Sequence, residues 1–409
     1  MNIFTKGCWK IINVGIVTIY PPPLSIHGRL GGVASYSKNL VNSLLKFCSV
    51  VVLAEKLPIS KDNYYESALI HRCWTKDFRY PFQIFKILLR SQVDVVHVQY
   101  ETYLFGGLFS ALVFPLLLAL VRLMRKPVIV TMHGVVPLSK INKSFLKENQ
   151  IPSNALIMRL GLTFLVRLIV FLSTSVIVHE KNLMDILKEE YDCSISKIKV
   201  INHGIEEPTV SISSDEAKKK LGLLSKRVIL FFGYITGYKN VGLLIDSAKF
   251  LKINNWLILI AGGMHPRLAS DRNYVDYISK LREKAAKISE KSILFKGFVA
   301  EEEISLYFSA ADLVILPYSI SMSSSGPLSL AASYGKPFLV SAAFREVITF
   351  DDVQFMNDPK KLAAKIDCFF ENPESKYKIL ARIDEFRRGR SWDKIAEKTF
   401  LLYTAIADV

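Results

Sequence analysis

The sequence predicts an α/β protein built from two Rossmann-like, doubly wound domains in tandem. Short apolar runs, typical of buried parallel strands, alternate with helical segments through both halves of the chain. A mostly polar stretch, residues 208–215, separates the two series and reads as a linker. With 409 residues, the chain is long enough for two domains of ordinary size, each with its own core.

The first half contains six runs that predict strands, with helical segments between most of them. They are residues 12–18, 49–53, 94–99, 127–132, 175–178 and 197–201. We therefore expect a first domain over residues 1–208. The tail, residues 391–409, places Trp392, Ile395, Phe400 and Tyr403 at helical spacing, so we expect a helix that packs back onto this domain.

The second half repeats the alternation and predicts a second domain over residues 216–390. The predicted strands are residues 227–232, 256–261, 292–296, 313–316 and 337–340, and the predicted helices are 241–251, 274–288, 301–310 and 359–370. Ligands of open α/β sheets bind beyond the carboxyl ends of the strands. We expect the two domains to face a central cleft at those ends.

Charge and cysteine usage narrow the class of protein. The net charge is +16 and the isoelectric point is about 9.4, which favours anionic partners: phosphorylated substrates, anionic lipid or nucleic acid. No nucleic-acid-binding motif accompanies the charge, so we expect no nucleic-acid partner. The five cysteines are scattered without metal-binding spacing, which argues against a zinc site and is typical of a reducing, cytoplasmic compartment.

Two apolar segments raise the question of a membrane. Residues 102–121 carry no charge and are long enough to cross a bilayer. Because predicted strands flank this segment on both sides, we expect a crossover helix between parallel strands instead. Residues 155–172 are interrupted by Arg159 and Arg167 and predict a helix lying on a surface. With their basic neighbours, both segments suggest docking on an anionic membrane; the alternative is burial against the sheet.

Two glycine-bearing turns open helical segments and resemble phosphate cradles. Gly31 and Gly32 precede one helix, and Ser324, Ser325 and Gly326 precede another about 290 residues later. A glycine turn at a helix start directs free N–H groups and the positive end of the helix dipole at one point. Each turn could also be a plain turn or helix cap.

Two ionisable side chains are candidates for chemistry at the strand ends. His133 follows a predicted strand, where an imidazole could bond a sugar hydroxyl or stabilise charge; the alternative is a structural histidine. Lys239 lies in a loop that begins with Gly233, and its ammonium suits a diphosphate. His97 lies inside a strand and is expected in the core, whereas His203 could serve a hinge or contact ligand.

Many short motifs, in one order along nearly the whole chain, resemble the GT-B fold glycosyltransferases of retaining family 4, the glycosyl transferases group 1 type. The matching segments are 31–34, 94–97, 131–134, 200–205, 232–239, 261–263, 297–299, 302–309, 311–317, 334–337, 345–347 and 391–395.

The resemblance implies a function and a location. It implies that the second domain holds a nucleotide sugar and the first the acceptor. Sugar would pass, with retention, to a lipid-linked or glycan acceptor in cell-surface polysaccharide or glycoconjugate synthesis. No metal or other cofactor is expected. We expect a cytoplasmic enzyme, peripheral on the inner membrane face and in contact with anionic lipid.

The resemblance also assigns the site residues. His133 and Lys239 would be catalytic. The residues expected at the donor diphosphate are Gly31, Gly32, Gly233, Lys239, Ser324, Ser325, Gly326 and Leu328. The residues expected at the nucleoside are Gly263, Phe298 and Val299.

The chain departs from the family pattern at the donor site. Met322 and Leu330 stand where the family usually has two glutamates, and Tyr234 and Thr236 occupy the region of its usual arginine. These departures leave two alternatives open: a catalytically inactive homologue that serves as a partner subunit, or a nucleotide-sugar epimerase.

Overall fold

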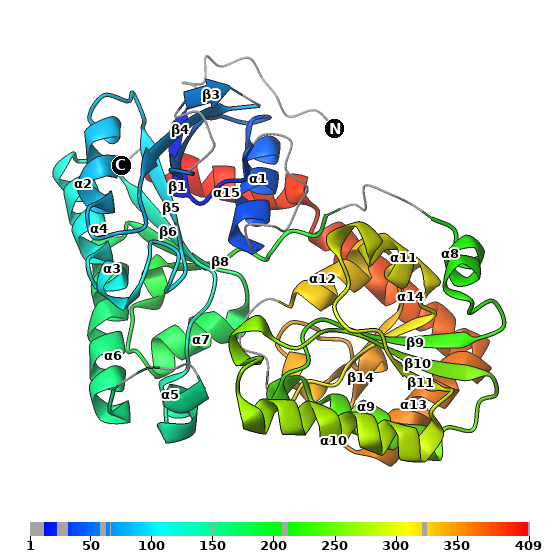
Figure 1. Ribbon diagram of the computed structural model, residues 1–409. Helices are drawn as coiled ribbons and strands as arrows, with labels where there is room; N and C mark the ends of the chain where they lie inside the picture. The colour runs from blue at the N-terminus through cyan, green and yellow to red at the C-terminus, as the bar shows by residue number, and fades with distance from the viewer. Residues whose placement is uncertain are drawn as a thin grey trace. The chain divides into compact units, whose positions relative to one another are not determined.

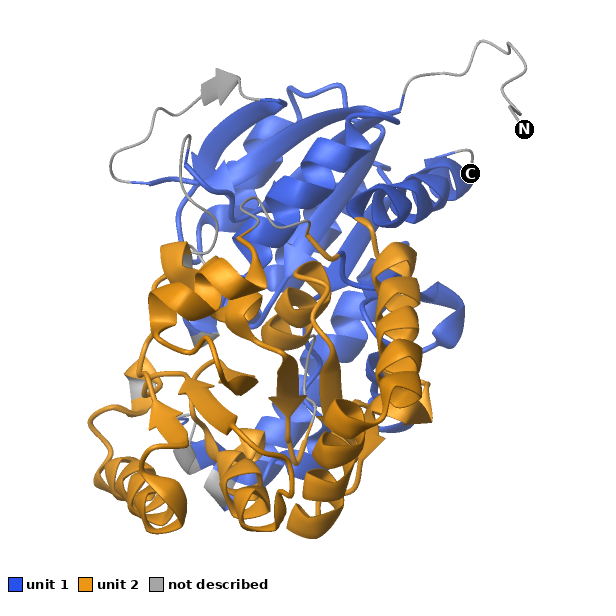
Figure 2. Cartoon of the chain, turned by 90° about the vertical axis from the view of Figure 1, so that its right-hand side faces the viewer, with its two compact units in different colours: residues 1–204, 392–409 blue, residues 205–391 orange. Residues whose placement is uncertain are grey.

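The computed structural model describes residues 12–22, 32–57, 63–65, 67–148, 151, 153–206, 212–320 and 325–407. The chain divides into two units (Figure 2). Unit 1 comprises Met1–Gly204 and Trp392–Val409, and unit 2 comprises Ile205–Ser391. The chain therefore leaves unit 1 after Gly204 and re-enters it at Trp392.

Unit 1 is built on an eight-stranded sheet with strand order β3-β4-β2-β1-β5-β6-β7-β8. All neighbours are parallel except the antiparallel pair β3 and β4. The strands are β1 (Asn13–Thr18), β2 (Ser49–Glu55), β3 (Asn63–Tyr65), β4 (Leu69–Trp74), β5 (Val95–Tyr100), β6 (Val128–Met132), β7 (Ser175–Val178) and β8 (Ile198–Val200).

Helices cover both faces of this sheet (Figure 1). On one face α2, α4 and α6 pack side by side, and on the other α1 packs against α15. The helices are α1 (Gly32–Leu44), α2 (Tyr80–Leu88), α3 (Leu108–Leu112), α4 (Phe114–Leu123), α5 (Lys143–Glu148), α6 (Ala155–Leu172), α7 (Lys181–Glu189) and α15 (Trp392–Ala407). Because both faces are covered, β5 and β6 are buried at every position.

Unit 2 is built on a six-stranded, fully parallel sheet with strand order β11-β10-β9-β12-β13-β14. The strands are β9 (Arg227–Phe232), β10 (Trp256–Ala261), β11 (Ile293–Phe295), β12 (Leu313–Leu316), β13 (Phe338–Ser341) and β14 (Gln354–Phe355). The helices are α8 (Ser214–Leu221), α9 (Val241–Ser247), α10 (Arg272–Ser289), α11 (Ile304–Ala310), α12 (Gly326–Ser333), α13 (Pro359–Glu371) and α14 (Pro373–Gly389). Two doubly wound sheets in tandem confirm the predicted fold class.

The uncharged segment 102–121 is a crossover, as predicted. It lies between β5 and β6, which pair in parallel, and it forms α3 and α4 instead of one long helix. Phe114 and Leu117 of α4 are fully buried. Among the described residues, α6 is the helix long and apolar enough to span a membrane by length and composition, and 28% of it is buried.

The return of the chain into unit 1 depends on a close contact at Gly204. A Cβ atom at Gly204 would lie 2.4 Å from the indole of Trp392, so a side chain there would collide with that ring. Further along α15, the hydroxyl of Tyr403 lies 2.6 Å from Nδ1 of His97 in β5. The C-terminal helix is therefore part of the unit 1 core, with Ile395 and Tyr403 fully buried.

Candidate active site

In unit 2, the loop after β9 gathers three predicted site residues around one backbone position. Gly233 has φ of 105°, a conformation that favours glycine. A Cβ atom at Gly233 would lie 2.8 Å from Nζ of Lys239 and 3.3 Å from Cγ of Pro327 in the first turn of α12. The ammonium and the start of α12 therefore converge over Gly233.

Lys239 is a buried cation at this point. Its side chain is 8% exposed, and its Nζ lies 5.7 Å from the centre of the Tyr318 ring. Burial lowers the pKa of Lys239 to about 8. The group is thus mostly charged at neutral pH, and an anion placed beside it would face little competing water.

The N-terminus of α12 is capped by Ser325. Its hydroxyl accepts a hydrogen bond from the backbone N–H of Leu328 at 3.3 Å. That cap engages the Leu328 amide, which the resemblance assigned to the diphosphate. At Gly326, a Cβ atom would meet no atom of the described residues within 4 Å, so the helix start is open with respect to that part of the chain. The predicted residue Ser324 and the departure at Met322 lie outside the described residues.

Glycines at the end of β10 leave room for close backbone approach. A Cβ atom at Gly262 would lie 2.0 Å from the carbonyl oxygen of Gly233, and one at Gly263 would lie 3.1 Å from the backbone nitrogen of Phe298. The Phe298 ring is 67% exposed, and it stacks with the Tyr234 ring at a centroid distance of 6.3 Å. The exposed Phe298 ring and the Tyr234 ring therefore lie beside Gly233, where the Lys239 ammonium and the start of α12 meet; we call this meeting point the convergence over Gly233.

Leu330, at one of the two departures from the family pattern, packs against the unit 2 core from α12. Its side chain has no group that bonds a hydroxyl. Val299, the third residue assigned to the nucleoside, is 6% exposed, so its side chain belongs mainly to the core.

In unit 1, α1 begins at Gly32, and Gly31 lies outside the described residues. Among the residues that the structure describes, none has an atom within 4 Å of a Cβ atom built at Gly32. One turn further along α1, the Tyr36 ring lies 4.7 Å from the His133 ring, edge to face. The predicted glycine turn and the predicted histidine are thus connected through Tyr36.

Both ring nitrogens of His133 have hydrogen-bond partners. Nε2 lies 2.9 Å from the side-chain oxygen of Gln99, and Nδ1 lies 3.2 Å from Nε2 of His179. Burial, with the nearby histidines, holds the pKa of His133 well below its ordinary value. The ring is therefore neutral at physiological pH.

The sequence reasoning missed the residues around His133. Gln99 lies in β5, His133 directly follows β6 and His179 directly follows β7, so all three stand at the same edge of neighbouring parallel strands. That strand-end position was the available signal. His203 joins the cluster through ring contacts with His179, Tyr36 and Trp392. His97, expected in the core, is fully buried.

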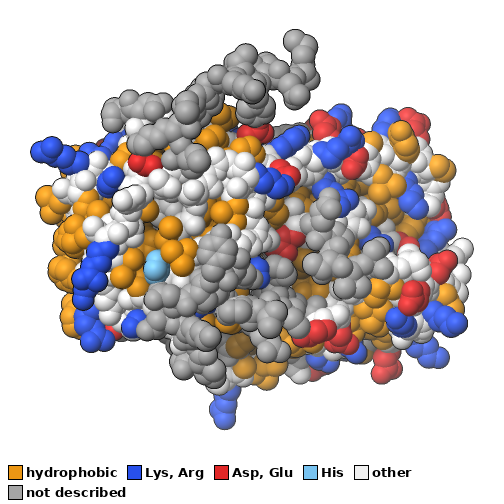
Figure 3. Space-filling view, turned by 90° about the horizontal axis from the view of Figure 1, so that it is seen from above, with side chains coloured by type: hydrophobic (Ala, Val, Ile, Leu, Met, Phe, Trp, Pro, Cys, Tyr) orange, Lys and Arg blue, Asp and Glu red, His pale blue; other side chains and the backbone are white. Residues whose placement is uncertain are grey.

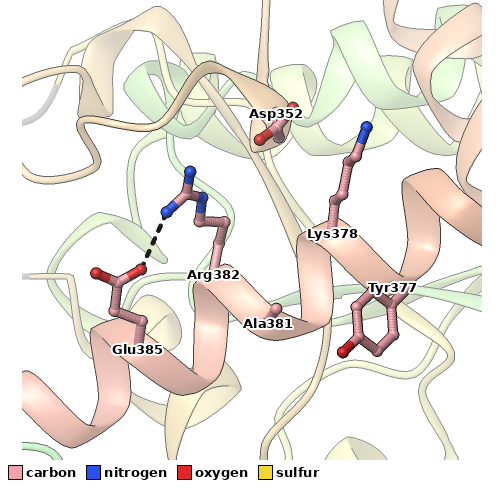
Figure 4. A pocket seen from close by; sticks show the side chains of 6 residues that line it. All are labelled: Asp352, Tyr377, Lys378, Ala381, Arg382 and Glu385. Atoms are coloured by element: carbon pink, nitrogen blue, oxygen red, sulfur yellow. Dashed lines mark hydrogen bonds and ion pairs between the residues drawn. The ribbon is translucent and has the colours of Figure 1, made fainter.

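A pocket of about 370 Å³ lies elsewhere, on α14 of unit 2 (Figure 4). Its lining residues are Asp352, Tyr377, Lys378, Ala381, Arg382 and Glu385. Arg382 and Glu385 pair at 3.1 Å along the helix. This surface hollow contains none of the residues that the sequence assigned to a site.

Within the part of the chain that the structure describes, no group of three or more His, Cys, Asp or Glu side chains is placed to hold a metal ion.

Two family models match the chain in succession. The model described as Glycosyltransferase Family 4 matches residues 30–207, and the model described as Glycosyl transferases group 1 matches residues 213–385. The curated alpha-monoglucosyldiacylglycerol synthase of Streptococcus pneumoniae is 26% identical over 286 residues. That match covers 64% of this chain, and it spans 58% of the length of the relative.

Solved structures share the fold over nearly the whole chain. Sucrose-phosphate synthase from Thermosynechococcus elongatus superposes with a TM-score of 0.70 at 15% identity, covering 97% of this chain and 99% of the other. Anabaena HepE, solved with UDP and glucose, gives 0.67 at 14% identity, covering 97% and 100%. WaaG, a glycosyltransferase of lipopolysaccharide biosynthesis, gives 0.59 at 14% identity, covering 96% and 100%.

Proposed function

The chain is a GT-B glycosyltransferase, a family 4 domain followed by a group 1 domain, and we propose that it transfers a hexose from a nucleoside diphosphate sugar to a lipid acceptor at an anionic membrane surface. Glycosyl transfer is the activity of the family. The donor, the acceptor, retention at the anomeric carbon and the membrane location are the proposal.

The convergence over Gly233 carries the proposal. In glycosyl transfer, negative charge builds on the departing diphosphate while the sugar approaches an oxocarbenium ion. The Lys239 ammonium and the open start of α12 supply fixed positive potential at one point. We propose that these groups stabilise the leaving group without a divalent metal, and that the reaction retains the anomeric configuration.

The aromatic pair next to this point supports a nucleotide donor. A nucleobase could stack against the open face of Phe298 or Tyr234, where Gly263 keeps the backbone accessible. A uridine nucleotide is a reasonable first probe because HepE was solved with UDP and with UDP-glucose.

The name of the curated relative supports a lipid acceptor, since it is a synthase of a glucosylated diacylglycerol. The outer face of unit 1 supports it independently. The helices α2, α4 and α6 carry apolar side chains that are at least 39% exposed; we call these residues the outer helix face. They are Phe82, Leu116, Leu123, Leu156, Ile157, Leu160, Phe164 and Phe171.

Charge at this face complements anionic lipid. Lys86 and Arg90 lie at the end of α2, and Arg122 and Arg125 at the end of α4, all exposed. Figure 3 shows hydrophobic and basic side chains next to one another along its left-hand edge, the side of α2 and α4 in Figure 1. Apolar side chains flanked by arginine and lysine are typical of surfaces that lie in the membrane interface.

A transfer assay tests donor and acceptor together. Purified protein is incubated with labelled UDP-glucose and vesicles of phosphatidylglycerol that contain diacylglycerol. We expect labelled glucolipid, and UDP should raise the melting temperature in a thermal-shift assay. A protein that neither binds UDP or other nucleoside diphosphates nor forms product would favour the inactive partner subunit, and conversion of the donor to an epimer would favour the epimerase.

A flotation assay tests the membrane contact. The variant L160E places a charge in the outer helix face at a residue that is 63% exposed, so the fold should tolerate it. L401E makes the same change on α15 at a residue that is 59% exposed and serves as the matched control. We expect L160E to lose binding to phosphatidylglycerol vesicles and L401E to keep it. Equal binding by both variants would remove the outer helix face from the proposal.

A further inference from the structure

Three neighbouring strands of unit 1 end in side chains bonded in a row: Gln99 at β5, His133 after β6 and His179 after β7. We propose that His179 is a positioning residue for His133, because it fixes which nitrogen of the His133 ring carries the proton. The inference rests on the proposed function, in which His133 serves the sugar-transfer site.

The backbone carbonyl of Ile201, which follows β8, determines which nitrogen of His179 carries a proton. Its oxygen lies 3.1 Å from Nδ1 of His179, whose side chain is fully buried. A carbonyl oxygen only accepts hydrogen bonds, so His179 carries a proton on Nδ1. In a neutral imidazole the other nitrogen, Nε2, then has a lone pair and accepts.

The contact between His179 and His133 then determines which nitrogen of the His133 ring carries the proton. Nε2 of His179 lies 3.2 Å from Nδ1 of His133. Because Nε2 of His179 accepts, the proton of the His133 ring lies on Nδ1. Nε2 of His133 is left with a lone pair.

Gln99 can complete the pattern without added charge. In the structure Oε1 of Gln99 lies 2.9 Å from Nε2 of His133 and Nε2 of Gln99 lies 3.2 Å from Nε2 of His97, so the proposed proton positions require the amide turned by 180°. The two ends of the amide have nearly the same shape, so its hydrogen-bond partners decide which end faces which ring. With the NH₂ group toward His133 and the carbonyl toward His97, both contacts are satisfied.

The chain of bonds then runs in one direction to the C-terminal helix. With the amide in the turned orientation, Nε2 of His97, which also lies 2.7 Å from the Thr131 hydroxyl, donates to the Gln99 carbonyl, and Nδ1 of His97 accepts from the Tyr403 hydroxyl at 2.6 Å. Every imidazole in the row is neutral in this arrangement. That suits the site, because an imidazolium placed there would be desolvated.

The remaining neighbours of His179 are consistent with a neutral pair. The Tyr36 ring of α1 lies 5.0 Å away and the His203 ring 5.4 Å away. On the element that follows, Glu180 accepts from the side chain of Asn202 at 3.3 Å. Burial and the other imidazoles hold the pKa of His133 far below its ordinary value, which agrees with a neutral ring.

Nitrogen-detected NMR of histidine-labelled full-length protein tests the inference directly, because nitrogen shifts distinguish the two tautomers. We expect the Nδ1–H form for His133 in the unmodified protein. In H179F, which keeps a ring but removes both nitrogens, we expect a mixture or the Nε2–H form. H203F is the matched control, since the His203 ring contacts the cluster while its Nδ1 lies 2.7 Å from the Gly204 carbonyl oxygen.

Kinetics with UDP-glucose and diacylglycerol vesicles separate positioning from simple destabilisation. We expect H179F to lower kcat about ten- to hundredfold while KM for the donor changes little, as for a misplaced reacting group. H179Q, whose amide offers one donor and one acceptor, should recover part of that loss.

Unchanged His133 tautomer in H179F would overturn the inference, and so would a changed tautomer with unchanged kcat. Failure of the proposed function is distinct, because the unmodified protein would then form no glucolipid while the NMR result still decides the role of His179.

Discussion

The two units share one architecture and differ in the chemistry at their strand ends. In unit 2, the end of β9 presents a buried ammonium and an open helix start at one point. In unit 1, the ends of β5, β6 and β7 present Gln99, His133 and His179, whose side chains bond one another. The comparison teaches that unit 2 gathers positive potential at its strand ends, whereas the polar groups at these strand ends of unit 1 are mostly buried and bonded to one another.

The exposed sides of the helices also differ in polarity between the two units. The outer helix face of unit 1 is apolar with basic ends, whereas α14 of unit 2 carries paired charges such as Lys378 with Glu374 at 2.7 Å. The same fold therefore exposes mainly apolar side chains on the outer helix face of unit 1 and charged side chains on α14 of unit 2. Two doubly wound domains need only a covered sheet, so the exposed side of each helix is free to vary.

The largest expected effect comes from removing the cation of unit 2. We expect K239A to lower transfer from UDP-glucose about ten- to a thousandfold, the scale of losing one group that stabilises charge in the transition state. K249A, which removes an exposed lysine paired with Asp246 on the surface, should change transfer less than twofold, roughly the limit for a surface ion pair. Steady-state kinetics measures both variants. Equal rates for K239A and the unmodified enzyme would contradict the proposal that Lys239 stabilises the leaving diphosphate.

The glycine beneath the cation gives the next prediction. G233A should weaken UDP binding about ten- to a hundredfold, because φ of 105° is strained for alanine and its methyl group would displace the Lys239 ammonium. G237A is the matched control in the same loop, since a methyl group there meets no atom within 4 Å. Calorimetry of UDP binding compares the two, and similar affinities would contradict the convergence over Gly233.

A third prediction concerns the contact between Gly204 and Trp392, where the C-terminal helix α15 begins. G204A should destabilise the protein by about 1–3 kcal/mol, the usual cost of overpacking, because the methyl group collides with Trp392. G389A, in an exposed turn of α14 with open space around it, should have a much smaller effect. Denaturant unfolding measures the difference, and matching midpoints would show that the Trp392 contact is loose.

The smallest effect should follow from pH. Because burial lowers the pKa of Lys239 to about 8, the ammonium is retained below that pH and lost as the pH rises through it. UDP affinity should therefore fall between pH 7 and 9, by up to about tenfold for each pH unit above the pKa. In K239A this part of the pH dependence should disappear. A slope that survives in K239A would assign the titration to another group.

Much of the fold could be predicted because buried parallel strands are continuous apolar runs. All eleven predicted strands are present, from residues 12–18 to 337–340. β4 was missed since its outward positions carry His71 and Cys73 and an inward one carries Arg72, which breaks the apolar pattern. Arg72 is nonetheless fully buried, because its guanidinium donates to backbone carbonyls of Glu55, Tyr20 and Pro21.

The sequence could predict only part of the candidate site. Lys239 and Gly233 could be singled out because they follow a strand within one loop, and the structure places them together. The row from Gln99 to His179 was missed, since its members come from separate strands with no fixed spacing and only their positions at the strand ends indicated it. His97 and Tyr403 bond across 306 positions of sequence, a contact that only the packing of α15 creates.

The two crossings of the chain, after Gly204 and before Trp392, impose an order of assembly during synthesis on the ribosome. Residues of unit 2 are contiguous and can fold as soon as they emerge. Unit 1 begins first but waits for α15, since Ile395 and Tyr403 complete its interior. We therefore expect the amino-terminal part to lack its last helix while nearly 190 further residues are translated, with the apolar residues that pack against α15 uncovered over that interval.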